Sequence, residues 1–145
     1  MKILAVDLGR ARTGLAVCDG NEVLASPAGV VAEWNREALL RKIAGRAGEL
    51  SVGEIVVGLP RNMDGTEGPS ARAAREFAQA LRGLVHVPVV MQDERGTTIT
   101  AHNYLNDTDT RGKKRKAVVD AVAATVILEN HLAYRRNHPA GPAEK

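Results

Sequence analysis

The sequence predicts a mixed α/β fold, in which three antiparallel strands and then parallel strands form a five-stranded sheet with helices on both faces. Two observations carry this prediction. Three short strand-like segments with tight-turn signals between them come first, and apolar strand runs then alternate with stretches of helical periodicity. Such alternation produces parallel strands with helices packed over the sheet. For 145 residues we expect one domain over residues 1–136 and a disordered tail over residues 137–145.

The antiparallel part is predicted from three segments, which are Ile3–Asp7, Thr13–Cys18 and Val23–Val31. A short polar turn that contains glycine separates the first two. Asp19-Gly20-Asn21 is a strong hairpin signal before the third. Pro27 and Gly29 then indicate an edge strand or a bulge, because proline donates no ladder hydrogen bond and glycine weakens a strand interior.

Helices and further strands alternate in the rest of the chain. Helices are predicted over residues 36–50, 70–81 and 116–134, and strands over residues 54–59 and 87–91. Asn35 is the expected N-cap of the first helix. The run at residues 54–59 is continuously apolar, as in a strand buried on both faces, and is expected to lie parallel to the first strand. A short helix is expected over residues 97–105. Residues 106–116 contain no apolar residue and are predicted to form a mobile loop.

Composition excludes several classes of protein. Hydrophobic residues make up 44% of the chain and charged residues 26%, which is typical of a globular domain. Cys18 is the only cysteine, so no internal disulfide forms and the reducing cytoplasm is the expected location. No signal pattern is present, and no apolar stretch approaches the roughly 18 residues that span a bilayer. We therefore expect no membrane association.

Positive charge concentrates before the last helix. The formal net charge is +3, and the basic cluster consists of Arg111, Lys113, Lys114, Arg115 and Lys116. A cluster of this kind suits a nucleic-acid backbone, and a solvated charged surface is the alternative. Aromatic residues are only 3% of the chain and are widely scattered. Stacking surfaces need several aromatics on one face, so contact with the backbone rather than with bases is expected.

Carboxylates occur where three separate segments approach the expected core. Asp7 ends the first strand, Asp93 and Glu94 follow the last strand, and Asp120 shares a helical stripe with Ile127. An ionised carboxylate in such a place costs several kcal/mol to desolvate unless it is paired or binds a metal. Ligands in α/β sheets collect beyond the carboxyl ends of parallel strands. The three segments are therefore expected to converge on one site.

Converging carboxylates suit Mg²⁺ or Mn²⁺, and two such ions roughly 3.5–4 Å apart serve phosphodiester cleavage. A two-metal nuclease site is the resulting prediction. Taken singly, each acid has an ordinary structural alternative. Asp7 would cap a hairpin turn, the acids at 93 and 94 would pair with Arg95, and Asp120 would pair with Lys116. Strand alternation alone leaves open which of Asp93 and Glu94 faces the site.

Four motifs resemble, in their order along the chain, those of the YqgF family, also called RuvX. The motifs are Asp7-Leu8-Gly9 with Arg12 and Gly14, Val57-Gly58-Leu59-Pro60 with Asn62 to Thr66, Asp93-Glu94-Arg95, and Asp120 to Ala124. The resemblance extends to about residue 134. It implies an RNase H-like fold and a metal-dependent nuclease. The family's members were first proposed as Holliday junction resolvases and are now mostly described as nucleases that mature the 5′ end of 16S rRNA in ribosome biogenesis.

The resemblance also implies roles for individual residues. Asp7, Glu94 and Asp120 take the positions of the metal-binding acids, and Asp93 is a further catalytic candidate. Arg12 and Arg95 would contact phosphate or hold the acids in place, and the basic cluster would grip the substrate backbone. The family commonly has a bulky apolar residue after Asp-Glu-Arg, and Gly96 stands there in this chain.

Other functions remain open from the sequence. A resolvase acting on branched DNA would want a homodimer, whereas trimming of a ribosomal RNA precursor, free or within a ribosomal particle, suits a monomer as well. A non-catalytic RNA-binding factor in ribosome assembly is another alternative. An ATPase of the actin-like and sugar-kinase class also carries an Asp-x-Gly turn, but needs two such domains to enclose its nucleotide.

Overall fold

The computed structural model describes residues 1–94 and 112–137, with side chains at residues 1–94 and 122–137. The strands are β1 (Ile3–Asp7), β2 (Arg12–Cys18), β3 (Ala25–Ala32), β4 (Glu54–Leu59) and β5 (Val89–Asp93), and the helices are α1 (Arg36–Leu50), α2 (Pro69–Arg82) and α4 (Gly112–Asn137). The sheet has the order β3-β2-β1-β4-β5. β2 pairs antiparallel with β1 and β3, whereas β4 pairs parallel with β1 and β5. These pairings confirm the predicted mixed sheet.

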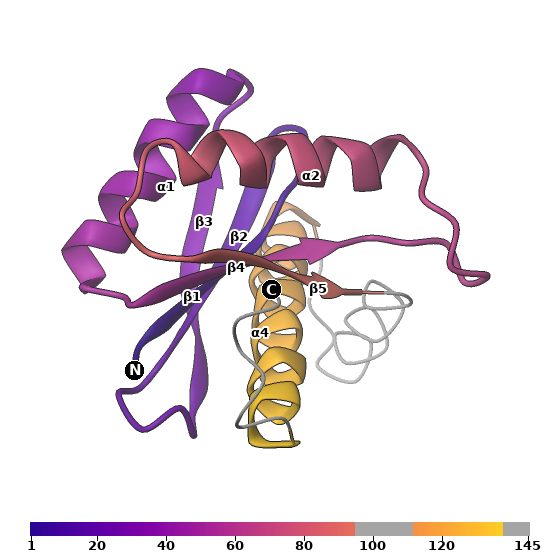
Figure 1. The fold of residues 1–145 in the computed structure, drawn as a ribbon. Helices are drawn as coiled ribbons and strands as arrows, with labels where there is room; N and C mark the ends of the chain where they lie inside the picture. The colour runs from indigo at the N-terminus through magenta and orange to yellow at the C-terminus, as the bar shows by residue number, and fades with distance from the viewer. Residues whose placement is uncertain (95–111, 138–145) are drawn as a thin grey trace.

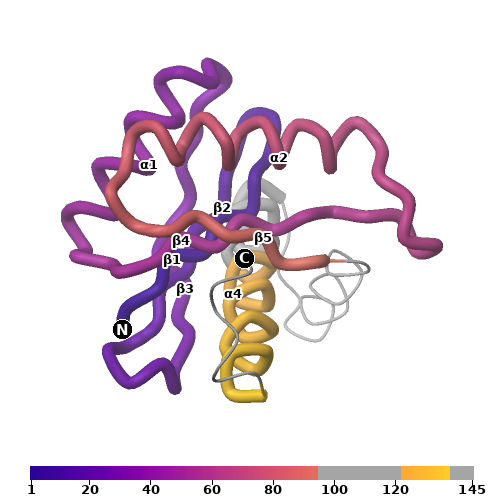
Figure 2. Tube along the Cα trace, in the orientation of Figure 1, coloured from indigo at the N-terminus to yellow at the C-terminus, as the bar shows by residue number. Residues whose placement is uncertain are grey.

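Helices cover both faces of the sheet, as predicted. Figure 1 shows α1 and α2 on one side and α4 on the other. Both crossovers, from β3 to β4 and from β4 to β5, pass over the α1/α2 side, which the chain trace in Figure 2 makes easy to follow. Each face has its own apolar core, with Leu4 and Val6 of β1 beneath α1 and α2, and Ile3 and Ala5 beneath α4.

Two local features predicted in the first part of the chain, the N-cap of α1 and the irregular edge strand, are present in the structure. The Asn35 side chain accepts a hydrogen bond from the backbone N–H of Ala38 at 2.9 Å, which confirms the predicted N-cap of α1. β3 is an edge strand, and its pairing with β2 shifts register between Leu15 and Ala16. The extra residue of this bulge is Ala28 of β3, next to Gly29, whose φ of +104° favours glycine.

Two strand boundaries differ from the predictions. β3 begins at Ala25 rather than Val23, because the Asp19 carboxylate accepts hydrogen bonds from the N–H groups of Val23 and Leu24 and holds them in the turn. β5 covers Val89–Asp93 rather than residues 87–91. Pro88 has no N–H to donate to a ladder, so the strand starts after it and continues to Asp93.

The last helix begins earlier than predicted. Residues 112–116 were expected in a loop, but α4 starts at Gly112. Lysine and arginine are good helix formers, and neither proline nor glycine occurs from residue 113 to 137, so a helix forms there without apolar residues. Asn137, which was predicted as the first residue of the tail, is instead the last residue of α4. The predicted short helix at 97–105, the remainder of the loop and residues 138–145 of the predicted tail lie outside the described residues. No helix in the described part of the chain is long and apolar enough to cross a membrane.

Candidate active site

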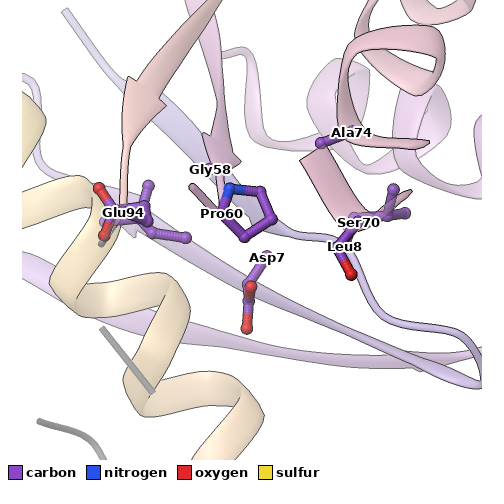
Figure 3. Close-up of a pocket in the computed structure, with 8 residues that line it drawn as sticks. Asp7, Leu8, Gly58, Pro60, Ser70, Ala74 and Glu94 are labelled. Carbon is purple, nitrogen blue, oxygen red and sulfur yellow. The ribbon is translucent and has the colours of Figure 1, made fainter. Parts of the chain in front are cut away.

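A small pocket lies at the carboxyl ends of the parallel strands. It is lined by Asp7, Leu8, Gly58, Pro60, Ser70, Ala74, Glu94 and Ile127. Its volume of about 40 Å³ is enough for a metal ion or a few water molecules. Figure 3 shows the Asp7 and Glu94 side chains, with Pro60 between them in that view; Asp7 ends β1 and Glu94 follows β5, and β4 lies between these strands. Two of the three predicted acidic segments therefore meet in one pocket.

Strand alternation explains why these two carboxylates face the same side of the sheet. Ile3 and Ala5 of β1 lie in the core beneath α4, and Asp7 is the next residue of that set. Val90 of β5 lies in the same core, and Glu94 follows it at an even interval. The Glu94 N–H donates to the carbonyl of Leu59 at 3.0 Å, which extends the pairing of β4 and β5 by one step. Glu94 is only 7% exposed.

Asp93 points to the opposite face. Side chains of a strand alternate between its two faces, so Val89, Met91 and Asp93 share one face. Val89 and Met91 pack in the core beneath α1 and α2, so Asp93 faces that side. Its carboxylate forms an ion pair with Nη1 of Arg61 at 3.5 Å, and its side chain is 35% exposed. Of the two adjacent acids, the structure brings Glu94 into the pocket with Asp7 and leaves Asp93 outside it.

Gly58 of β4 is a pocket residue to which the sequence analysis assigned no role. It lies on the central strand of the three that end at the pocket. A Cβ added there would stand 2.5 Å from Cδ1 of Ile127 and 3.2 Å from Cγ of Glu94. Glycine therefore allows α4 and Glu94 to approach the sheet closely. The sequence does contain a signal for this role, because a lone glycine inside a buried strand often marks a site where another part of the molecule approaches closely.

The Gly58→Ala substitution is expected to disturb the pocket. The added methyl group must displace Ile127 and press on Glu94, which should cost about 1–3 kcal/mol of unfolding free energy and lower the rate of the phosphodiester cleavage that the sequence predicts by roughly 10- to 100-fold. Gly45→Ala in α1 is the matched control, since its added Cβ has no atom within 4 Å apart from its chain neighbours and the nearby backbone of its own helix. That control should be neutral or stabilising by up to about 1 kcal/mol. Urea unfolding and cleavage assays on both variants check the prediction, and equal behaviour would contradict it.

The turn after β1 brings cationic groups to the same edge. A Cβ on Gly9 would collide with the carbonyl oxygen of Arg12, so glycine is required for this tight turn. The Gly9 N–H donates to Oγ1 of Thr13 at 3.3 Å. Arg12 is half-buried at the start of β2, and Arg10 is exposed in the turn. Arg10 thus lies in the turn that starts immediately after Asp7, and Arg12 is the first residue of the strand that follows the turn.

The remaining predicted site residues are only partly described. Asp120 and the basic residues 113–116 belong to α4, but their side chains lie outside the described residues, as do Arg95 and Arg111 entirely. Residue 120 precedes the pocket residue Ile127 by seven positions on the same helix. No group of three potential metal-binding side chains occurs among the side chains that are described.

Comparison with known proteins shows the family of this chain. Residues 1–134 match the family described as "RuvX: Holliday junction resolvase". This chain belongs to the RuvX family. An Anaeromyxobacter relative named "Putative pre-16S rRNA nuclease" is 47% identical over 132 residues, which cover 91% of this chain and 96% of that protein. A Streptomyces coelicolor relative of the same name is 41% identical over 142 residues, covering 97% of this chain and 85% of the relative.

The RuvX assignment agrees with the fold. The structure titled "T. thermophilus RuvC in complex with Holliday junction substrate" aligns with a TM-score of 0.60 at 12% identity, over 94% of this chain and 96% of that chain. At this identity the likeness shows the fold alone, and it confirms the predicted RNase H-like class. Family and relatives together identify the chain as a nuclease, whose substrates are nucleic acids.

Proposed function

We propose that this RuvX-family nuclease hydrolyses phosphodiester bonds at the pocket of Asp7 and Glu94, and that it matures the 5′ end of precursor 16S rRNA. One observation carries the proposal most strongly. Two carboxylates from separate strands line one small pocket at the carboxyl ends of the parallel strands, where residues of α2 and α4 also line it. The substrate follows from the names of relatives that match nearly the whole chain.

The donors in this pocket fit Mg²⁺ or Mn²⁺. Asp7 and Glu94 offer carboxylate oxygens, which these hard cations prefer. We propose Asp120 as the third ligand, since α4 passes along this face of the sheet and residue 120 lies two helical turns before Ile127. A pair of bound ions would supply activation of the attacking water and charge stabilisation at the leaving oxygen.

The protein's own residues would position the substrate around that chemistry. Asp7 lies on the middle strand of the sheet, and the buried Glu94 follows β5 with β4 between them, so the packed strands hold the two carboxylates in fixed places. Arg12 and Arg95 are proposed to bind phosphates next to the cut. The basic cluster (Arg111 and residues 113–116) is proposed to hold the backbone further along, since four of its members lie on the first turns of α4.

The proposed organisation is a single nuclease domain over residues 1–136, with α4 shared between sheet packing and substrate binding. A ribosomal precursor as substrate would place the protein in the cytoplasm with ribosomal particles. End trimming requires one active site for one strand, so a monomer suffices, whereas a resolvase would pair two sites in a homodimer.

A cleavage assay separates the candidate functions. The full chain is incubated with Mg²⁺ or Mn²⁺ and either labelled 5′-extended 16S precursor or a labelled four-way DNA junction. We expect cleavage of the RNA only, and its loss with Asp120→Asn. Cleavage of the junction alone would favour the resolvase instead. Equal cleavage by wild type and Asp120→Asn would point to a contaminating nuclease, and no cleavage of either substrate would favour a binding factor.

A further inference from the structure

Trp34 is exposed on a segment that the backbone holds in place. Its side chain is 73% exposed, between the end of β3 and the start of α1. On one side, the Glu33 N–H donates to the carbonyl of Ala11 at 2.9 Å. On the other, Asn35 caps α1. Tryptophan is enriched at binding interfaces, because its ring is apolar and its N–H is polar.

This segment lies at the same end of the sheet as the pocket. Arg12 pairs with Ala32 across β2 and β3, and Asp7 pairs with Gly14 across β1 and β2. The turn that follows Asp7 is therefore hydrogen-bonded to the segment that contains Trp34. Two strand spacings separate β1 from β3, roughly 10 Å, a distance that about three stacked nucleotides cover.

The charges around Trp34 favour an anionic partner. Arg10 lies in the adjoining turn, Arg12 is the first residue of β2, and Arg36 donates from Nη1 to the carbonyl of Gly9 at 3.1 Å. Within the described part of the chain, none of these three arginines forms an ion pair with a carboxylate.

The two carboxylates nearest to Trp34 in sequence, Glu33 and Glu37, are paired with other cations. Glu33 pairs with Nζ of Lys42 at 2.7 Å, and this hydrogen bond lowers the pKa of Glu33. Glu37 pairs with Arg41 at 3.0 Å. The three arginines beside Trp34 therefore remain available to phosphates.

We propose that Trp34 stacks on an unpaired base of the substrate strand while Arg10, Arg12 and Arg36 contact its phosphates. The strand would then leave the cleavage site across the β1–β3 side as single-stranded nucleic acid. The inference rests on the proposed function for the identity of the strand. It also revises the expectation from composition that bases are not contacted, because one exposed indole beside cations is sufficient to stack a single base.

Trp34 is the only tryptophan in the chain, so its fluorescence reports directly on stacking. The wild-type protein is titrated in EDTA, which prevents metal-dependent cleavage, with a short oligoadenylate, an abasic strand of equal length, and a duplex. We expect the oligoadenylate to quench the fluorescence strongly and the other two to quench it little. Equal quenching by the oligoadenylate and the abasic strand, or quenching by neither, would overturn the inference.

Variants test whether the indole contributes binding energy. Trp34→Ala should weaken oligoadenylate binding by roughly 5- to 100-fold, and Trp34→Phe should retain most of the affinity. Leu24→Ala is the matched control, since Leu24 is 64% exposed in the β2–β3 hairpin at the other end of the sheet. Unchanged affinity in Trp34→Ala would overturn the inference. The proposed function is tested by a different result: it is wrong if the wild-type protein with metal does not cut the precursor, whatever the outcome of the binding test in EDTA.

Discussion

Replacing Glu94 with glutamine is expected to abolish cleavage, whereas replacing the adjacent Asp93 with asparagine should leave it nearly intact. Glu94 shares the pocket with Asp7, so its loss removes a proposed metal ligand. Loss of a residue that only hydrogen-bonds a metal ligand lowers metal affinity or activity by about 10- to 100-fold, so loss of the ligand itself should lower the cleavage rate more than about 100-fold. Asp93 lies outside the pocket in a partly exposed ion pair with Arg61, worth at most about 1 kcal/mol of stability.

Single-turnover cleavage of labelled 16S precursor at saturating Mg²⁺ measures this difference. Circular dichroism and urea unfolding of both variants verify that each is folded. Because the two acids are neighbours and both substitutions remove one negative charge, the comparison controls for the net charge of the site. Equal rates in the two variants, or a larger loss in Asp93→Asn, would contradict the geometry of the pocket.

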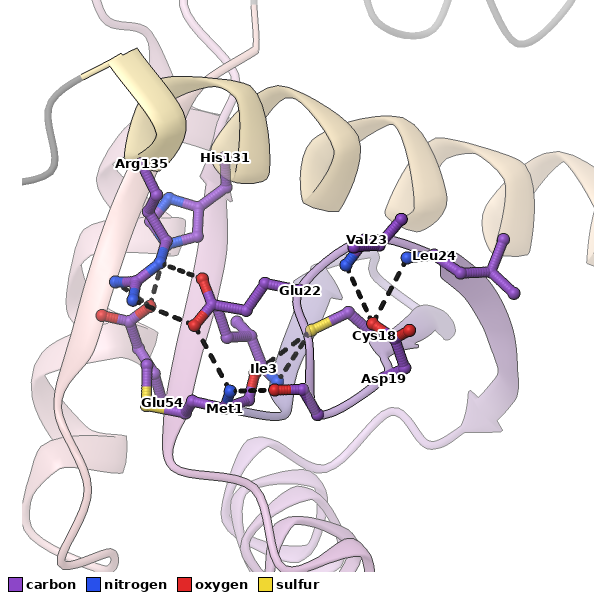
Figure 4. Close-up of polar contacts among 11 residues, drawn as sticks. Met1, Ile3, Cys18, Asp19, Glu22, Val23, Leu24, Glu54, His131 and Arg135 are labelled. Atoms are coloured by element: carbon purple, nitrogen blue, oxygen red, sulfur yellow. Dashed lines mark hydrogen bonds and ion pairs between the residues drawn. The ribbon is translucent and has the colours of Figure 1, made fainter.

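The largest effect on stability is expected from His131→Ala. Nε2 of His131 lies 2.9 Å from Oε1 of Glu54, and both side chains are buried. This pair joins α4 to the start of β4, at the end of the sheet opposite the pocket (Figure 4). Removing the imidazole takes away a partner of a buried carboxylate. Breaking a buried pair in this way lowers the free energy of unfolding by about 3–5 kcal/mol. Nη1 of Arg135 stays 3.6 Å from Oε1 of Glu54, so the lower end of that range is expected.

Arg41→Ala is the control for a lost ion pair. Arg41 pairs with Glu37 at 3.0 Å across one turn of α1, and the two side chains are 73% and 75% exposed. Such a pair contributes at most about 0.5 kcal/mol. Urea unfolding midpoints, with unchanged denaturant dependence, give the two free-energy changes. A loss in His131→Ala no greater than that of the control would show that the buried pair does not anchor α4.

Local residue patterns were sufficient to predict the sheet and the helices on both of its faces. Alternating apolar runs and the Asp19-Gly20-Asn21 turn depend on neighbours in sequence, and so does the cap at Asn35. The start of α4 was wrong because an absence of apolar residues was interpreted as a loop. Lysine and arginine support a helix through their intrinsic propensity, even where no core is buried.

The site needed the packing as well as the sequence. Adjacent acids on a strand point to opposite faces, but only the register of β1, β4 and β5 shows which face carries Asp7. The need for glycine at position 58 follows from its contact with Ile127, which lies on a helix far away in the sequence. In the sequence, Trp34 is one of a few widely scattered aromatic residues. Its place beside the turn after Asp7 depends on the pairing of β2 and β3, which the sequence does not show.

The most direct test of the proposed active site is a crystal structure of the full chain with Mn²⁺, in which anomalous scattering locates the ions. We predict a peak in the pocket, with carboxylate oxygens of Asp7 and Glu94 at about 2.1 Å, as expected for small divalent ions, and with Asp120 completing the site. A peak bound instead at Asp93, or an empty pocket at saturating Mn²⁺, would contradict the account.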